Sequence, residues 1–68
     1  MKNSIRVERA ILDITQAELA QKVNVSRQTI NTIEAGKYVP STVLAMKIAK
    51  TFSKSVEEIF SLEDGDWK

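Results

Sequence analysis

The sequence predicts an all-α fold of five short helices in a single domain. Helix-start signals recur along the chain: Thr15 and Ser55 each stand three residues before a glutamate, which is the pattern of a capping box. No stretch shows the alternation of apolar and polar residues that marks a half-buried strand. A chain of 68 residues is long enough for one domain with one small core.

The first two helices are predicted over residues 3–12 and from Thr15 onward. In the second helix Thr15 caps the backbone and Glu18 reaches back to complete the capping box. The turn after this helix contains Asn24, a residue type that tolerates the left-handed backbone conformation. The side chains expected on the inward faces are Ile5, Arg9 and Leu12 in the first helix, and Leu19, Ala20 and Val23 in the second.

The third helix is predicted over residues 26–35, with Ser26 as its cap. Gly36 ends it, because glycine is the usual residue just past a helix C-terminus. Ser41 starts a fourth helix, and the capping box at Ser55 opens a brief fifth one. The side chains expected in the core are Leu44, Ala45, Ile48, Ala49 and Phe52 from the fourth helix, and Ile59 and Phe60 from the fifth.

The composition argues against several classes of function. The chain has no Cys and no His, so it lacks a thiolate nucleophile, an imidazole base, a disulfide and a zinc finger. Its two glycines stand far apart and form no phosphate-binding loop. We therefore expect no enzyme activity, no cofactor, no metal site and no small-molecule substrate. No apolar run is long enough for a membrane span or a signal peptide, so we expect a cytoplasmic protein with no membrane partner.

The net charge of +1 hides an uneven distribution along the chain. Residues 1–56 hold nine Lys and Arg against four Asp and Glu, a net charge of +5. Residues 57–68 hold one Lys against five acids, a net charge of −4. A basic body suits a surface that binds a polyanion, and chance segregation of a few charges is the alternative. We expect a domain over residues 1–62 and an acidic C-terminal tail over residues 63–68, with a turn at its Asp-Gly pair.

Residues 16–33 have the spacing of a helix-turn-helix. Small Ala20 falls where the two helices would cross, and Asn24 falls in the turn between them. Ile30 and Ile33 can then pack back from the second helix of the pair onto the first. Two helices cross this closely only if a small residue lies at the crossing and the turn tolerates a sharp bend.

The opposite face of the third helix is polar and is chemically suited to DNA. At 100° per residue, an arc of about 140° contains Arg27, Gln28, Asn31, Thr32 and Ala35. Arginine pairs with guanine, glutamine pairs with adenine, and a threonine methyl group can meet a thymine methyl group. An ordinary solvated face is the alternative, but such faces usually carry mixed Glu and Lys, and this one has no acid before Glu34.

The segment ITQAELAQKVNVSRQTINTIEAGKYVPS, residues 14–41, resembles the helix-turn-helix family of phage repressors, Cro and the small bacterial regulators of the xenobiotic-response-element type. The similarity extends over residues 5–60. It implies a lambda-repressor-like helix-turn-helix DNA-binding domain. In that family the third helix, here residues 26–35, lies in the major groove with its N-terminal half on the bases.

The resemblance also assigns roles to individual residues. Gln16 matches a position that contacts phosphate or supports a base contact, and Lys37 and Tyr38 follow the recognition helix where the family meets the DNA backbone. We expect Arg27, Gln28 and Thr32 to read bases, and Ser26, Asn31 and Lys37 to hold phosphates. The full set of predicted DNA-binding residues is Gln16, Ser26, Arg27, Gln28, Thr29, Asn31, Thr32, Lys37 and Tyr38.

Two charges are expected to meet at the edge of the core. Arg9 shares its stripe with Ile5 and Leu12, and Glu34 stands between the apolar and the polar face of the third helix. Because the family places a paired Arg and Glu here, we expect a largely buried Arg9–Glu34 ion pair. A leucine is frequent in the family where this chain has Glu8, so the first helix is expected to pack differently at that position.

The leading hypothesis is a sequence-specific, double-stranded DNA-binding transcriptional regulator. We expect a repressor that acts as a homodimer on a palindromic operator, because one short helix reads few base pairs. The dimer interface is predicted at Ile59, Phe60, Leu62 and Trp67, with Val7 and Ile11 as the next candidates. The alternatives are an antitoxin-like protein whose main role is to bind a protein partner through its tail, and a pure protein-interaction module.

Overall fold

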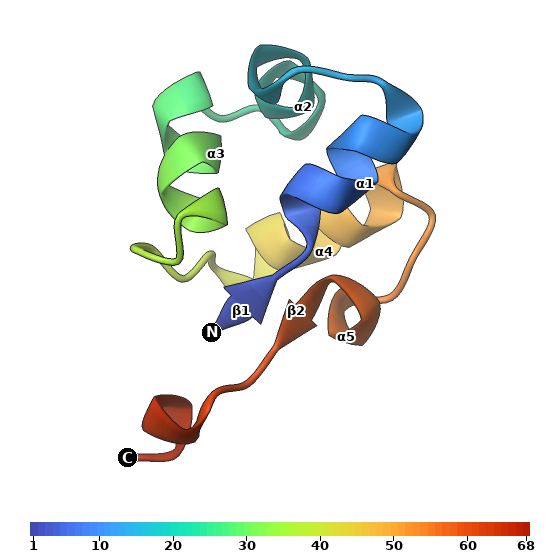
Figure 1. Ribbon diagram of the computed structural model, residues 1–68. Coiled ribbons are helices and arrows are strands. Elements are labelled where there is room, and N and C mark those ends of the chain that lie inside the picture. Colours follow the sequence, from blue (N-terminus) through green and yellow to red (C-terminus); the bar gives the residue numbers. More distant parts are fainter.

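The computed structural model describes all 68 residues as five α-helices and a two-stranded sheet near the chain termini (Figure 1). The helices are α1 (Ile5–Leu12), α2 (Gln16–Val23), α3 (Arg27–Glu34), α4 (Thr42–Thr51) and α5 (Val56–Ile59). The strands are β1 (Lys2–Asn3) and β2 (Phe60–Ser61), and a short 3-10 helix follows at Asp64–Trp67. The predicted fold class is confirmed. None of the helices combines the length and the hydropathy that crossing a membrane requires.

The sheet was not expected from the sequence, and it shortens the first helix. β1 pairs with β2 in antiparallel register, with Asn3 opposite Phe60. The next backbone N–H, that of Ser4, donates to the carbonyl of Ile59 across 2.9 Å. Since residues 2 and 3 are held in a strand, α1 begins at Ile5, and the predicted start at residue 3 is wrong.

The predicted start of each helix from α2 to α5 is confirmed by its cap. The capping side chains are Thr15, Ser26, Ser41 and Ser55, and each accepts a hydrogen bond from the N–H three residues further on. At Thr15 and Ser55 a glutamate completes the capping box. The turns are confirmed as well, because Asn24 and Gly36 both take the left-handed conformation, with φ angles of 61° and 75°.

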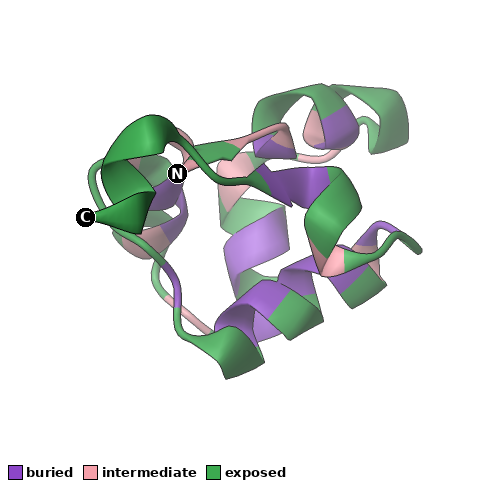
Figure 2. Cartoon of the chain, turned by 90° about the horizontal axis from the view of Figure 1, so that it is seen from below, coloured by how far each residue is buried: buried purple, intermediate pink, exposed green.

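The core consists of 13 buried apolar residues from all five helices, the end of α4 and β2. Figure 2 shows the buried positions on the sides of the helices that face one another. Every core residue expected from α2 to α5 is among them. The core residues are Ile5, Leu19, Ala20, Val23, Ile30, Ile33, Leu44, Ala45, Ile48, Ala49, Phe52, Ile59 and Phe60.

The inward face of α1 differs from the prediction at two positions. Leu12 is exposed, because it is the last residue of α1 and the backbone turns at Asp13 into the left-handed conformation. Glu8 is buried instead, and its Oε2 lies 2.8 Å from Nζ of Lys54. A buried carboxylate needs a partner. The hydrogen bond to Glu8 raises the pKa of Lys54, which keeps its charge and balances that of Glu8.

The predicted dimer interface is wrong at Ile59 and Phe60. These side chains are 2% and 6% exposed and close the core of the protomer, so they offer no surface to a second copy. The segment after them remains outside the core, and both Leu62 and Trp67 are exposed. Only these two members of the predicted interface could contact a partner.

The acidic tail has more structure than the sequence indicated. Asp64–Trp67 forms one 3-10 turn, and the N–H of Glu63 donates to the carboxylate of Asp66 across 2.8 Å. The amine of Met1 lies 3.0 Å from Oε1 of Glu63 and 3.1 Å from Oδ2 of Asp66. The backbone hydrogen bond lowers the pKa of Asp66. The tail is therefore held beside β1.

The capping box of α5 predicts a specific loss of stability in acid. The hydrogen bond from the N–H of Ser55 lowers the pKa of Glu58 from its ordinary value of 4.5. A carboxylate with a lowered pKa stabilises the folded state at higher pH, and this contribution disappears as the pH falls below 4.5 and through the lowered pKa. Glu58→Gln should therefore lose less stability than the wild type between pH 6 and pH 3, measured by urea unfolding.

The matched control is Glu57→Gln. Glu57 is exposed on the same short helix and takes no part in the capping box. This variant should keep the acid dependence of the wild type. Parallel loss of stability in the wild type and Glu58→Gln would show that the capping box contributes nothing to the acid transition.

Candidate DNA-binding interface

Helices α2 and α3 form the predicted helix-turn-helix, and one side of α3 is free of other elements (Figure 1). Ile30 and Ile33 are buried on the inner side of α3, where they join the core with Ala20. The side chains on the opposite face are open to solvent. Its exposed residues are Arg27, Gln28, Asn31 and Ala35, and Thr32 is half-buried beside them. This face is broad enough and polar enough to meet the edges of base pairs.

Gln16 connects the first turn of α2 to three positions of α3. Its Nε2 donates to Oδ1 of Asn31 and to Oε1 of Glu34, each across 3.3 Å. Its Oε1 accepts from Nη1 of Arg27 across 3.4 Å. These partners stand about one helical turn apart, so a single side chain orients a whole row of α3. Gln16 thus lies where it can support the side chains that are expected to contact DNA.

The hydroxyl groups of α3 are bonded within the helix. Oγ of Ser26 accepts the N–H of Thr29 across 3.1 Å and shares a 2.9 Å hydrogen bond with the hydroxyl of Thr29. The hydroxyl of Thr32 lies 3.0 Å from the backbone carbonyls of both Gln28 and Thr29. The proton of the Thr32 hydroxyl is therefore already engaged, and its methyl group can meet a thymine methyl group, as expected from the sequence.

Three of the predicted DNA-binding side chains make no polar contact with the rest of the protein. Gln28 is exposed on α3, and Lys37 and Tyr38 are exposed in the loop that follows. The amide of Gln28 can pair with two adjacent polar groups of one base, and the ammonium of Lys37 can meet a phosphate. Their freedom contrasts with the bonded state of Arg27 and Asn31.

The Arg9 and Glu34 side chains meet in two parallel contacts. Nε of Arg9 lies 2.7 Å from Oε2 of Glu34, and Nη2 lies 3.1 Å from Oε1. Nη1 of Arg9 also donates to the carbonyl of Ile14 across 3.2 Å. The side chains are 16% and 2% exposed. The hydrogen bond to Glu34 raises the pKa of Arg9, so the guanidinium keeps its positive charge beside this carboxyl group.

Two residues that contact the C-terminal end of α3, Asn3 and Arg6, were not predicted from the sequence. Nδ2 of Asn3 donates to the carbonyl of Ile33 across 2.8 Å. Nε of Arg6 lies 3.8 Å from Oε1 of Glu34, although the Arg6 side chain is 80% exposed. Both contacts join residues that are far apart in the chain, so no local sequence motif predicts them.

Residues 5–59 match the sequence model of the helix-turn-helix family. The chain belongs to that family. It is 53% identical over 66 residues to an uncharacterised HTH-type transcriptional regulator of Methanocaldococcus jannaschii, which covers 97% of this chain and all of the relative. It is 47% identical over 64 residues to YgzD of Bacillus subtilis, also named an uncharacterised HTH-type transcriptional regulator, covering 94% of this chain and 97% of YgzD.

A third relative widens the range of organisms. An uncharacterised HTH-type transcriptional regulator of Archaeoglobus fulgidus is 48% identical over 64 residues, which cover 94% of this chain and 91% of the relative. The relatives thus include archaeal proteins as well as a bacterial one, a wider range than the phage and bacterial regulators whose family the sequence resembles. Membership of the family makes the chain a DNA-binding protein of the regulator type and not an enzyme.

The Arg9–Glu34 pair should be a major source of stability at the helix-turn-helix. Removing one partner of a buried ion pair leaves the other charge unpaired, which costs about 3–5 kcal/mol. Arg9→Ala should therefore lower the free energy of unfolding by about 3 kcal/mol in urea titrations. Arg6→Ala is the control, since Arg6 faces the same carboxylate from solvent and should cost only about 0–1 kcal/mol. Equal losses from the two variants would contradict a structural role for the pair.

Proposed function

We propose that the protein is a sequence-specific repressor that binds a palindromic operator as a homodimer in the cytoplasm, with α3 in the major groove. The exposed polar face of α3 is the observation that carries this proposal. Arg27 and Asn31 on this face are oriented by Gln16 before any DNA arrives. A surface held in advance loses less conformational freedom on binding than a set of free side chains.

The side chains of this face divide into two groups by their expected contacts. We propose that Arg27, Gln28 and Thr32 read bases, because they occupy the first half of α3 and the turn after it. Ser26, Thr29, Asn31, Lys37 and Tyr38 lie nearer the walls of the groove and would hold phosphates, with Gln16 as a support. Base contacts carry sequence information, whereas phosphate contacts set affinity and position.

Substitutions in the first group should change the sequence preference, whereas substitutions in the second should change only the overall affinity for DNA. Gln28→Ala should cost about 1–3 kcal/mol on the preferred operator and relax the preference at one base pair per half-site. Lys37→Ala should weaken binding to every duplex alike and reduce the salt dependence by about one unit of slope. The measurement is the affinity for a selected operator and for random duplex at two salt concentrations. The operator is first obtained by selecting bound sequences from a random duplex library.

This comparison distinguishes sequence-specific recognition of bases from electrostatic attraction to any DNA duplex. Equal loss of affinity for both duplexes in Gln28→Ala would show that α3 is an electrostatic contact without sequence preference. A selected sequence without two-fold symmetry would argue against a homodimer on a palindrome. Both results can be obtained with the purified wild-type chain and these single variants.

The side of the protomer next to α3 is the place where a second copy would sit. Two half-sites lie about 34 Å apart on DNA, so each recognition helix must be about 17 Å from the two-fold axis. The protomer measures 34 × 22 × 20 Å, so two copies that meet close to α3 would bring the recognition helices to this spacing. The exposed apolar side chains Val39, Val43 and Met46 lie in the loop and helix that directly follow α3.

We propose that these three residues form the interface between copies. Val43→Glu/Met46→Glu should convert the dimer to a monomer in sedimentation equilibrium. Operator affinity should then fall by at least about a hundredfold, since the two half-sites are no longer linked. Val7→Glu/Ile11→Glu is the control, because it places the same charges on exposed apolar residues of α1 and should leave the dimer intact.

Two results would show that the interface between copies lies on another part of the surface. A monomer in the α1 control would place it on α1. A monomer after Leu62→Ser/Trp67→Ser would place it on the tail, where the sequence had suggested it. Because all of these side chains are exposed, none of the substitutions removes a core contact.

A protein partner at the tail is the second candidate function. The observation that favours it is the exposure of Trp67, at 78%, beside the acidic residues Glu63 and Asp64. Deleting residues 62–68 would distinguish the two. Loss of repression in cells with unchanged DNA affinity and dimerisation of the purified chain would indicate a partner protein. Loss of dimerisation would instead place the tail in the interface between copies.

A further inference from the structure

We propose that Asn3 is a positioning residue for the DNA-binding surface. Its side chain ties the terminal sheet to the C-terminal end of α3 and thereby sets the direction in which the chain leaves the recognition helix. The effect on DNA binding rests on the proposed function, whereas the contact itself is independent of it.

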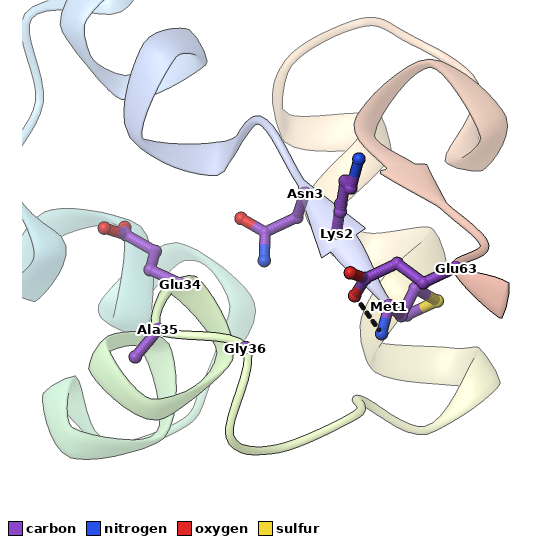
Figure 3. Close-up of a pocket in the computed structure, with 7 residues that line it drawn as sticks. All are labelled: Met1, Lys2, Asn3, Glu34, Ala35, Gly36 and Glu63. Atoms are coloured by element: carbon purple, nitrogen blue, oxygen red, sulfur yellow. Dashed lines mark ion pairs between the residues drawn. The ribbon is translucent and has the colours of Figure 1, made fainter. Parts of the chain in front are cut away.

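Both polar ends of the Asn3 amide are used. Nδ2 donates to the carbonyl of Ile33 across 2.8 Å, and Oδ1 accepts the N–H of Ile5 across 3.2 Å. The amide therefore bridges the start of α1 and the last turn of α3 in one orientation. Figure 3 shows the Asn3 side chain extending from β1 toward the end of α3.

The carbonyl that accepts this hydrogen bond belongs to the last turn of the recognition helix, where the chain turns toward Lys37. The last four carbonyls of an α-helix lack partners within the helix, and Ile33 is one of them. It receives the N–H of Gly36 across 3.0 Å, which closes the turn before Gly36 takes the left-handed conformation. Lys37 follows at once. The hydrogen bond from Asn3 thus fixes the turn that presents Lys37.

The other end of this connection is anchored in the core. Asn3 stands opposite Phe60 in the sheet, and Phe60 is buried. A shallow hollow lies beside Asn3, bordered by residues 1–3, residues 34–36 and Glu63 (Figure 3). Because this side is open, no neighbouring side chain stands ready to replace the amide if it is removed. A single side chain therefore couples the strand that leads into the tail to the end of the recognition helix.

The donor role of Asn3 can be tested with an acid of the same shape. The ionised carboxylate of Asn3→Asp still accepts the Ile5 N–H, but it cannot donate to the Ile33 carbonyl and repels that oxygen. Glu34 and Glu63 border the same hollow and disfavour a further negative charge, whereas the protonated acid can both accept and donate. The folded state thus raises the pKa of the new acid, so the variant should be less stable than the wild type at pH 7. The deficit should shrink as the pH falls toward about 4, the ordinary range of Asp.

Asn24→Asp is the matched control for this measurement. Asn24 is exposed in the turn before α3, and its side chain makes no hydrogen bond. Its stability relative to the wild type should not recover in acid. A deficit of Asn3→Asp that is absent at pH 7, or that is the same at pH 7 and pH 4, would overturn the assignment of the amide as a donor.

The positioning role is tested by its dependence on Lys37. Asn3→Ala should weaken binding to a random-sequence duplex by about three- to tenfold and reduce the salt slope by up to one unit, as the loss of one phosphate contact does. If Asn3 acts through Lys37, then Asn3→Ala/Lys37→Ala should bind no more weakly than Lys37→Ala alone. Ser55→Ala is the control, since it removes a helix cap far from α3 and should keep wild-type affinity and slope at a temperature where all variants are folded.

Two results would overturn the inference: wild-type binding by Asn3→Ala, or losses that simply add in the double variant. Failure of the wild-type chain to bind any duplex would be a failure of the proposed function instead. The two failures are distinguishable, because the first is seen only in a chain that binds DNA.

Discussion

The buried carboxylate of Glu34 is the constraint on which the helix-turn-helix depends. A charge with 2% exposure must be paired and hydrogen-bonded, and the side chains that bond Glu34 all come from outside α3. Arg9 supplies two contacts from α1, and Gln16 supplies one from α2. Three helices therefore converge on one side chain. The orientation of α3 relative to the rest of the domain follows from this convergence as much as from the apolar core.

The same arrangement explains how so small a domain can present an ordered binding face. The core holds only 13 residues, and a core of this size supplies modest stability. Hydrogen bonds and ion pairs around the edge of the core fix the orientation of the helices, which apolar contacts alone do not specify. Gln16 orients Arg27 and Asn31, while Asn3 holds the carbonyl of Ile33. The side chains that are free of such bonds, Gln28 among them, can bind DNA without first breaking a hydrogen bond within the protein.

Much of the candidate site could be predicted because its signals are local. The cap at Ser26, the turn at Asn24 and the alternation of apolar and polar positions on α3 all act within a few residues of one another. Such patterns depend on backbone geometry and hydrophobic periodicity, which hold in any fold. Glu8 illustrates the limit. Its position in the helix was evident, but its burial against Lys54, 46 residues away, was not.

The sequence by itself determined the helices from α2 to α5, the helix-turn-helix, the polar face of α3 and the family, because capping, periodicity and motif spacing are properties of short segments. The tertiary structure decided where the two ends of the chain meet. The pairing of β1 with β2 and the hydrogen bond from Asn3 to Ile33 join segments that are 30 or more residues apart. Strands of two residues are too short to show an alternation of apolar and polar residues. Their position is therefore set only when the core forms and brings the two ends of the chain together.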